Sequence, residues 1–372
     1  MRNGWWMAPV AVVLVLGGVL AGSWLARPRV DSGEKGSQVH VPSLPGTNTG
    51  GTAKPANPAA GSGVAPTQPT ASEPKPATPE PKRPADSEAQ VFVASFMRAR
   101  MAGDAAKLAG MVAPGAPGAT GIRLSSDADR MTAYAASLLG SGDPDSFVFR
   151  LSVAFASGQP GGEVAVETLR LTWKGGLKVA AFDEVANESL ALLADKEGKL
   201  QLSRGQDTAL VADLGALPAM AKPWGSNSEF GVGKEGWAVA APSLTGKTVL
   251  WVTHGLHPLL GFSRVNWNGA PVVTPVDLLF EGGAAEVAWA PGSDRYVAVT
   301  LTQPSGATAL AVYDVTGDRF GPDLSNVLGT VEYRVHRLRW LDASTLAFDL
   351  VKGNAPAGTW TYQINTRTLK GP

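Results

Sequence analysis

The sequence of 372 residues predicts a mainly β fold, with helices only near the start of its folded part. Three observations predict this class. The spacing of apolar residues changes from a period of 3.6 to a period of 2 near residue 147. Short apolar strands then recur about every 50 residues. The 44 glycines and 28 prolines fall mainly in one spacer and between these strands, which is typical of a turn-rich β fold.

Composition excludes several classes of function. The 32 basic and 32 acidic residues balance, so the whole chain offers no electrostatic reason to bind nucleic acid. The sequence contains no cysteine, which excludes disulfides, cysteine-ligated zinc, iron–sulfur clusters and thiol nucleophiles. We therefore expect no nucleic-acid partner and no cofactor.

The first segment, residues 1–30, is expected to cross a membrane as a helix. The 23 residues from Gly4 to Ala26 carry no charge, and at about 1.5 Å per residue they span a hydrocarbon layer of roughly 30 Å. A cleaved secretory signal with Met7–Leu20 as its apolar core is the alternative. We expect a single-pass anchor in the cell membrane with the body outside the cytoplasm, or a secreted body after cleavage.

Residues 31–86 are expected to form a disordered linker. They contain 11 prolines and 7 glycines but no aromatic residue, so they cannot bury enough apolar surface to offset their ordering entropy. Such a spacer reaches between ~45 Å as a flexible coil and ~170 Å when fully extended.

Residues 87–183 are expected to form a small α+β domain. Asp86 or Ser87 is expected to cap a first helix that runs to Met101, with Gln90 completing a capping box. The same patterns predict a short helix at 104–112 and a third helix from Ser126 through Leu138. Alternation of apolar residues then predicts strands at 147–153, 164–173 and 177–182.

This order of helices followed by a long-stranded antiparallel sheet resembles the cone fold of the nuclear-transport-factor-like superfamily. The resemblance covers about residues 87–183 and rests on the order of the elements. Alternatively, the hairpin at 147–173 belongs to the domain that follows, which would leave no separate α+β domain.

Residues 184–372 contain a repeat. Val239–Ser243, Trp289–Ser293 and Trp340–Ser344 match one another at offsets of 50 and 51 residues, and each precedes two apolar strands. A repeat of this length built from short strands predicts the blades of a β-propeller-like domain, because each blade needs neighbours to cover its faces. The strands at 189–194, 199–205 and 208–214 are interpreted as one more, degenerate blade.

Residues 287–299 and 309–317 are similar to the repeat of TolB-type and WD-like β-propellers, in which a strand ends in Trp-Ser-Pro-Asp-Gly before a turn. Ala290 and Gly292-Ser293 depart from that pattern, and the segment at Trp340 lacks the proline. The resemblance covers about residues 185–372 in degenerate form. It implies a role in protein interaction or scaffolding and transfers no catalytic residue.

The candidate ligand contacts are two histidines and two tryptophans in this half of the chain: Trp251, His254, His257 and Trp267. Two imidazoles three residues apart could share a metal ion, but a third ligand would be needed and no acidic residue lies between Glu235 and Asp277. We therefore predict a polar loop that contacts a ligand, with no metal site and no catalytic residue.

Other motifs have simpler interpretations. Gly231–Gly236 satisfies the dinucleotide pattern G-x-G-x-x-G but precedes a strand-like run, so a loop entering a blade is predicted and no nucleotide is expected. The pairs Asp127/Asp129 and Asp143/Asp145 are interpreted as a helix cap and a proline turn. The basic run Tyr333–Arg339 is interpreted as a guarded strand edge, with binding of an anionic polymer as the alternative.

These observations predict a membrane-anchored, extracytoplasmic binding or scaffold protein without catalytic activity. Its propeller-like domain would bind a protein or a cell-envelope polymer. The alternative is an exported small-ligand receptor or enzyme that uses a pocket of the α+β domain or a cleft of the propeller-like domain.

Overall fold

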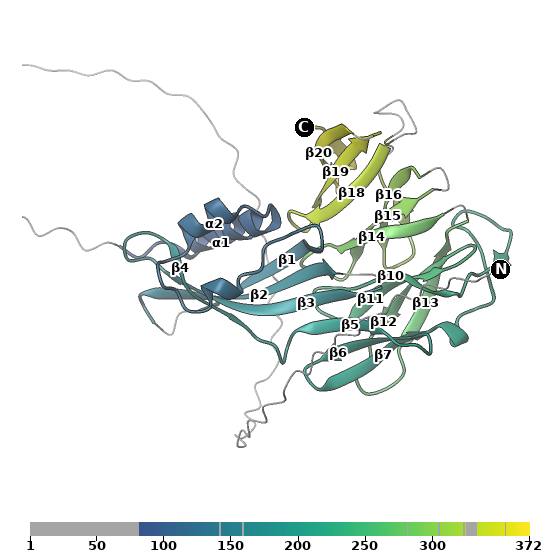
Figure 1. Cartoon of the computed structure of the whole chain (residues 1–372), viewed down its shortest axis with the longest axis horizontal. Helices are drawn as coiled ribbons and strands as arrows, with labels where there is room; N and C mark the ends of the chain where they lie inside the picture. Colours follow the sequence, from purple (N-terminus) through teal and green to yellow (C-terminus); the bar gives the residue numbers. More distant parts are fainter. Residues whose placement is uncertain are drawn as a thin grey trace, which may run out of the picture. The chain divides into compact units, whose positions relative to one another are not determined.

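The computed structural model describes residues 82–372, apart from 141–142, 158–159, 281, 304–305, 323, 325–332 and 354. The described chain is mainly β, as the sequence predicts (Figure 1). No helix within these residues is long and apolar enough to cross a membrane. The predicted membrane segment at 1–30 and nearly all of the linker at 31–86 lie outside the described residues and stay predictions.

The two predicted helices at the start of the folded part are present as α1 (Asp86–Met101) and α2 (Ala105–Met111). The predicted cap of α1 is wrong, because Asp86 and Ser87 already lie inside the helix. Ala85 precedes it, and the Ala85 N–H donates to a Glu88 carboxylate oxygen at 3.1 Å. The Asp104 side chain caps α2 by accepting the Lys107 N–H at 2.9 Å.

The helices lead into an antiparallel sheet in the order β1-β2-β3-β5-β6-β7, with β4 paired to β3 (Figure 1). Its strands are β1 (Asp129–Gly140), β2 (Ser146–Ser157), β3 (Gly162–Thr172), β4 (Lys178–Glu184), β5 (Leu190–Ala194), β6 (Lys199–Arg204) and β7 (Asp207–Asp213). The short elements η1 (Ala119–Gly121) and η2 (Leu214–Ala216) precede β1 and follow β7.

The third predicted helix is wrong, because residues 129–140 form strand β1. Ser126 does accept the Asp129 N–H at 3.1 Å, as a helix cap would, but the Ser126 N–H also donates back to the Asp129 carbonyl and closes a turn. β1 then pairs with β2 along its length. Two register shifts in this pairing disturb the strict alternation of buried residues, so the apolar spacing imitates a helix.

An ion pair is buried between the helices and this sheet. The Arg100 guanidinium donates to both carboxylate oxygens of Glu167, at 2.6 and 2.8 Å, and its Nε donates to the Arg123 carbonyl at 3.0 Å. The Arg100 and Glu167 side chains are 0% and 2% exposed. Apolar residues of α1 and of β1 to β4 surround the pair, which makes this region a packed interior.

The predicted domain boundary at 183/184 falls between β4 and β5. Both strands pair with β3: β4 pairs with the second half of β3, and β5 pairs with the start of β3. One sheet therefore continues across the boundary. The strands predicted as a degenerate blade, β5 to β7, are present, but they extend this sheet rather than form a sheet of their own. The division into domains 87–183 and 184–372 stays a prediction.

Three four-stranded antiparallel sheets follow in the described residues, as expected of a propeller-like β fold. The first contains β10 (Gly236–Pro242), β11 (Thr248–His254), β12 (Leu259–Arg264) and β13 (Val272–Leu278). The second contains β14 (Gly283–Trp289), β15 (Tyr296–Thr302), β16 (Thr308–Asp314) and β17 (Arg319–Phe320). The third contains β18 (Tyr333–Trp340), β19 (Thr345–Lys352), β20 (Ala355–Gln363) and β21 (Thr368–Lys370). A two-stranded hairpin, β8 (Met220–Ala221) and β9 (Phe230–Gly231), precedes them.

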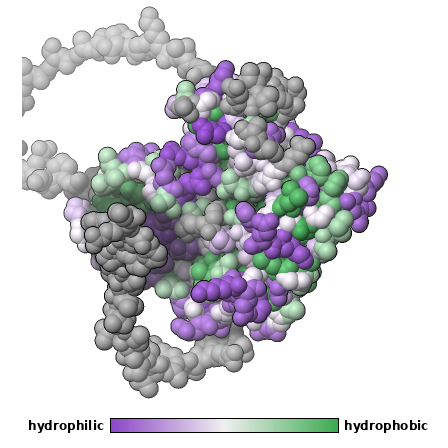
Figure 2. Space-filling model, turned by 45° about the vertical axis from the view of Figure 1, so that its right-hand side comes forward, coloured by the Kyte–Doolittle hydropathy of each residue, from purple (hydrophilic) through white to green (hydrophobic). Residues whose placement is uncertain are grey.

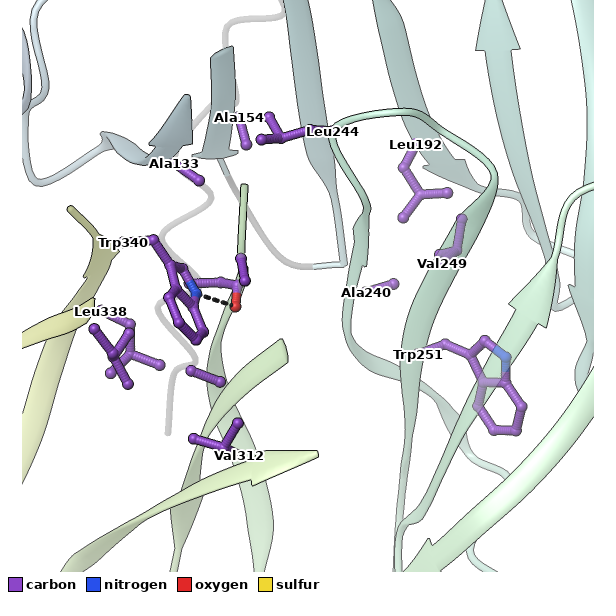
Figure 3. Packing of buried hydrophobic residues seen from close by; sticks show 14 of the residues in the cluster. Ala133, Ala154, Leu192, Ala240, Leu244, Val249, Trp251, Val312, Leu338 and Trp340 are labelled. Carbon is purple, nitrogen blue, oxygen red and sulfur yellow. Dashed lines mark hydrogen bonds between the residues drawn. The ribbon is translucent and has the colours of Figure 1, made fainter. Parts of the chain in front are cut away.

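A hydrogen bond of the same kind links the first strands of successive four-stranded sheets. The Trp289 indole N–H donates to the Ala241 carbonyl at 2.9 Å, and the Trp340 indole N–H donates to the Ala288 carbonyl at 2.8 Å (Figure 3). Strand pairing places Pro242, Trp289 and Trp340 at equivalent positions, so the first offset is 47 residues and not the 50 that the sequence match gave. Each indole N–H therefore donates to a carbonyl of the preceding sheet, that of the residue just before the position equivalent to the tryptophan.

Strand β1 reaches the third of these sheets. β1 lies beside β18 and β14. The Arg130 guanidinium pairs with Glu286 of β14 at 2.6 Å, and the second Glu286 oxygen accepts the Leu338 N–H of β18 at 3.1 Å. The seven-stranded sheet and the four-stranded sheets thus share one hydrophobic cluster, part of which Figure 3 shows between Ala133, Ala154 and Trp340.

Candidate functional site

The structure separates the four predicted ligand contacts. Trp251 is completely buried in β11, its indole N–H donates to the Ser263 hydroxyl at 2.9 Å, and its ring lies against Gly261, where a Cβ would come within 2.4 Å of it. Trp251 is thus part of the core, on the right of Figure 3. Trp267 is half-buried beyond the end of β12, with the Arg204 guanidinium 4.4 Å from the centre of its ring. Of the four residues, only His254 and His257 border the same loop, the one between β11 and β12.

His254 is the last residue of β11, and His257 lies in the loop that connects β11 with β12. His254 is exposed, with its Nδ1 3.5 Å from a Glu235 carboxylate oxygen. The His257 ring stacks on Phe280 at 4.8 Å between centres, and its Nδ1 lies 3.0 Å from the Phe280 carbonyl oxygen. The described residues contain no group of three side chains of the His, Cys, Asp or Glu type that could hold a metal ion.

Three chain segments are bonded side by side around this loop. The Gly233 N–H donates to the His257 carbonyl at 3.1 Å, and the Leu279 N–H donates to the Pro258 carbonyl at 2.8 Å. Only glycine fits at position 233, because a Cβ there would lie 2.4 Å from the Leu256 carbonyl oxygen. The loop is therefore held between the segments 230–235 and 277–280.

Apolar side chains project from these segments and from the hairpin that precedes them. We call the set the apolar end surface; its members are Met220, Trp224, Phe230, Leu256, His257 and Phe280. Leu256 is 75% exposed, Trp224 54%, Met220 50% and Phe280 41%. The Phe230 ring packs against Phe280 at 4.4 Å between centres, and Met220 pairs with Gly231 across the β8–β9 hairpin. Figure 2 shows hydrophobic areas among hydrophilic ones on the face it presents.

Asp277 fixes the backbone beneath this surface. Its side chain is buried, and one carboxylate oxygen accepts the Trp224 N–H at 2.7 Å. The other oxygen accepts the Tyr313 hydroxyl at 2.8 Å and an Arg319 N–H at 3.0 Å. Burial, and next the negative charge of Asp277, raise the pKa of the Tyr313 hydroxyl, which keeps this donor protonated. Asp277 thereby ties the loop that carries Trp224 to the sheet β14–β17.

Charged side chains border the apolar end surface. Lys222 and Glu229 form an exposed pair at 3.9 Å on the same hairpin, and Glu235 lies beside His254. The Lys234 ammonium donates to the Leu217 carbonyl at 2.8 Å. An apolar centre with a polar border is the composition of a protein interface.

The remaining motifs have structural roles. Gly231 ends β9 and Gly236 begins β10, so no helix follows the G-x-G-x-x-G pattern as dinucleotide binding would need. The interpretation of Asp127 and Asp129 as a helix cap is wrong, because they precede and begin β1. Asp129 instead pairs with Arg123 at 2.7 Å. The interpretation of Asp143 as part of a turn is confirmed, since its side chain accepts the Asp145 N–H at 2.9 Å.

The basic run Tyr333–Arg339 forms β18, which is the edge strand of its sheet, as the sequence predicts. Two of its cations are paired. Arg337 lies 2.5 Å from Asp127, and Arg339 lies 3.0 Å from Asp349. These pairs leave less positive charge on the strand for an anionic polymer.

No family model and no curated protein matches the chain. Many solved structures are weakly similar to it, and three of them follow. A candidate 6-phosphogluconolactonase from Bacteroides fragilis is 9% identical, with a TM-score of 0.25, over 67% of this chain and 84% of that one. TolB from Acinetobacter baumannii is 11% identical, with a TM-score of 0.24, over 64% of both chains. Prolyl oligopeptidase B from Galerina marginata is 11% identical, with a TM-score of 0.23, over 66% of this chain and 42% of that one. Similarities of this size carry no functional assignment.

Proposed function

We propose that this chain is a binding protein without catalytic activity, which captures a partner protein on the apolar end surface. The exposure of Leu256, Trp224, Met220 and Phe280 on one connected set of segments carries this proposal. Half of the exposed large hydrophobic residues in the described part of the chain lie there. Apolar groups that gather in this way normally mark an interaction site.

The geometry of the loop supports binding rather than chemistry. His257, the residue of this surface best suited to acid–base catalysis, has its ring against Phe280 and its Nδ1 toward a backbone carbonyl. Tryptophan, which this surface presents as Trp224, is enriched among the residues that carry most of the binding energy of protein interfaces. The polar border favours a protein over a purely lipid surface.

We further propose that residues 1–30 anchor the protein in the cell membrane and that residues 31–86 hold the folded part away from it, outside the cytoplasm. The uncharged stretch from Gly4 to Ala26 and the proline-rich composition of the spacer support this. The finer assignment of residues 185–372 to TolB-type and WD-like repeats belongs to the same proposal and rests on the sequence similarity at 287–317.

The double substitution Leu256→Asp with Phe280→Asp tests the proposal in the full chain. Leu193→Asp is the matched control, because Leu193 is 62% exposed on β5 and outside the apolar end surface. We expect the natural chain and the control to capture one stoichiometric partner from an envelope extract. The double variant should bind that partner at least about 10-fold more weakly, as for loss of a central interface residue.

Equal capture by all three proteins would refute the proposed surface. If the natural chain captured no protein while a panel of metabolites raised its unfolding temperature, the alternative of a small-ligand receptor would replace it.

A further inference from the structure

The loop between β12 and β13, residues 265–271, presents an Asn-Gly pair to water. Both Asn268 and Gly269 are exposed and lie outside the strands. The loop follows the end of β12, whereas the loop of His257 precedes its start, so the two loops lie at opposite ends of this strand. The sequence has one other Asn-Gly pair, Asn3-Gly4, which lies outside the described residues.

An asparagine that precedes a glycine can lose ammonia without an enzyme. The backbone nitrogen of the glycine loses its proton and attacks the side-chain carbonyl carbon of the asparagine. A new C–N bond closes a succinimide ring, the bond to the side-chain NH₂ group breaks, and ammonia leaves. One water molecule then opens the ring to an aspartyl or an isoaspartyl residue. A side chain on the following residue would crowd the attacking nitrogen, and glycine has none.

The hydrogen bonds of the loop leave the reacting groups of Asn268 and Gly269 accessible. The Asn268 side chain forms no hydrogen bond within the described part of the chain, and only its backbone N–H is held, by the Asn266 side-chain oxygen at 3.1 Å. The Gly269 N–H donates to the Asn266 carbonyl at 3.4 Å, which is longer than the usual range of about 2.7–3.2 Å. The attacking nitrogen is therefore only weakly restrained.

Two other exposed asparagines in turns differ in this respect. Asn187 is followed by Glu188, whose N–H donates to the Val185 carbonyl at 2.9 Å. Asn227 is followed by Ser228, whose N–H donates to the Ser226 hydroxyl at 3.1 Å. At both positions the following nitrogen forms a shorter hydrogen bond and belongs to a residue with a side chain. These asparagines are matched comparisons within the same protein.

We propose that Asn268 is a site of spontaneous deamidation that proceeds through a succinimide with Gly269. The product carries one more negative charge on a chain whose 32 basic and 32 acidic residues balance. Its isoaspartyl form has one additional methylene in the backbone of the loop, which makes it a substrate for protein isoaspartyl methyltransferases. The site shares no residue with the apolar end surface and does not depend on the proposed partner binding.

Incubation of the full chain in warm, mildly alkaline buffer, followed by peptide mass spectrometry, tests this proposal. The peptide that contains Asn268 should deamidate at least about 10-fold faster than the peptides that contain Asn187 and Asn227, since glycine alone leaves the attacking nitrogen uncrowded. Ion exchange should resolve a species with one more negative charge. A protein isoaspartyl methyltransferase with labelled S-adenosylmethionine should methylate the aged chain at this peptide.

Gly269→Ala should slow the reaction at residue 268 at least about 10-fold, because its methyl group crowds the attacking nitrogen. The added Cβ would lie 2.9 Å from the Asn266 side-chain nitrogen, the end of an exposed side chain that is able to turn away. Gly110→Ala is the matched control, since a Cβ there meets no atom within 4 Å, and its rate should equal that of the natural chain.

An intact Asn268 after incubation, equal rates at Asn187 or Asn227, or an unchanged rate in the Gly269→Ala variant would overturn the proposal. Leu256→Asp with Phe280→Asp should leave deamidation unchanged, so failure of this proposal and failure of the proposed partner binding can be told apart.

Discussion

Replacement of Asp277 tests how the apolar end surface is held. The Asp277 carboxylate accepts hydrogen bonds from the Trp224 backbone, the Tyr313 hydroxyl and the Arg319 guanidinium. Asp277→Ala removes the acceptor oxygens of all three hydrogen bonds at once. The Tyr313 hydroxyl is then left buried without this partner, and the loop that carries Trp224 loses its link to the sheet β14–β17.

The cost follows from these contacts. A hydrogen bond to a charged group contributes ≈ 1.5–3 kcal/mol, and two such bonds come from Trp224 and Tyr313. The Arg319 side chain is 32% exposed, so its ion pair adds about 0–1 kcal/mol. We therefore expect Asp277→Ala to lower the free energy of unfolding by about 3–7 kcal/mol. Asp277→Asn keeps an acceptor for the Trp224 N–H, so it should lower the free energy of unfolding by about half as much.

Urea unfolding followed by tryptophan fluorescence measures this loss, and partner capture measures its effect on the surface. Tyr313→Phe is the comparison, because it removes one of the three hydrogen bonds and should lower the free energy of unfolding by about 1.5–3 kcal/mol. Capture should fall with Asp277→Ala and stay near the natural level with Tyr313→Phe. The reasoning fails if Asp277→Ala is no more destabilising than Tyr313→Phe.

Three further predictions concern the fold. Glu167→Ala should lower the free energy of unfolding by ~3–5 kcal/mol because it leaves the buried Arg100 charge unpaired. The double variant Arg100→Met with Glu167→Leu should recover most of that loss. Equal free energies of unfolding of the single and double variants in urea would contradict this. Trp340→Phe removes the indole hydrogen bond to Ala288 and should cost about 1–3 kcal/mol, measured as a lower urea midpoint, and an unchanged midpoint would show that the link between sheets contributes nothing. The raised pKa of Tyr313 favours the folded state only while the hydroxyl is protonated, so the free energy of unfolding should fall as the pH rises above about 10, the pKa of an unfolded tyrosine. Tyr313→Phe should reduce this fall, and identical pH profiles for the two proteins would contradict the assignment.

Local sequence patterns predict the elements whose packing follows a simple period. The face of α1 that contains Val93, Phe96 and Met97 is buried as the 3.6-residue spacing predicts. Strands β2 and β3 follow the alternation of apolar residues at 147–153 and 164–173. The pattern of β1 predicts a helix because the bulges of this strand break the alternation of apolar residues, and its pairing with β2 leaves no signal in a local window of sequence.

The candidate site could be predicted only in part. The spacing of His254 and His257 identified the loop between β11 and β12, but Trp251 could not be recognised as a core residue. Consecutive residues of β11 are buried on both of its faces, so alternation does not distinguish an inward side chain from an outward one.

The other members of the apolar end surface come from distant parts of the chain. No local sequence motif marks Trp224 or Phe280. Their segments lie beside that of Leu256 only because of the Asp277 side chain and the backbone hydrogen bonds of residues 233 and 279. Exposure of an apolar side chain is a property of the folded state, so the sequence carried no direct signal of this surface.

The central claim, that the apolar end surface binds a partner protein, is tested most directly by photo-crosslinking of the full chain in the cells that produce it. Leu256→p-benzoylphenylalanine places a crosslinker on this surface, and Leu193→p-benzoylphenylalanine places one on β5. We predict one dominant crosslinked protein from position 256, absent from position 193 and reduced by the additional substitution Asp277→Ala. No crosslinked protein from position 256, or the same protein in equal yield from both positions, would contradict the claim.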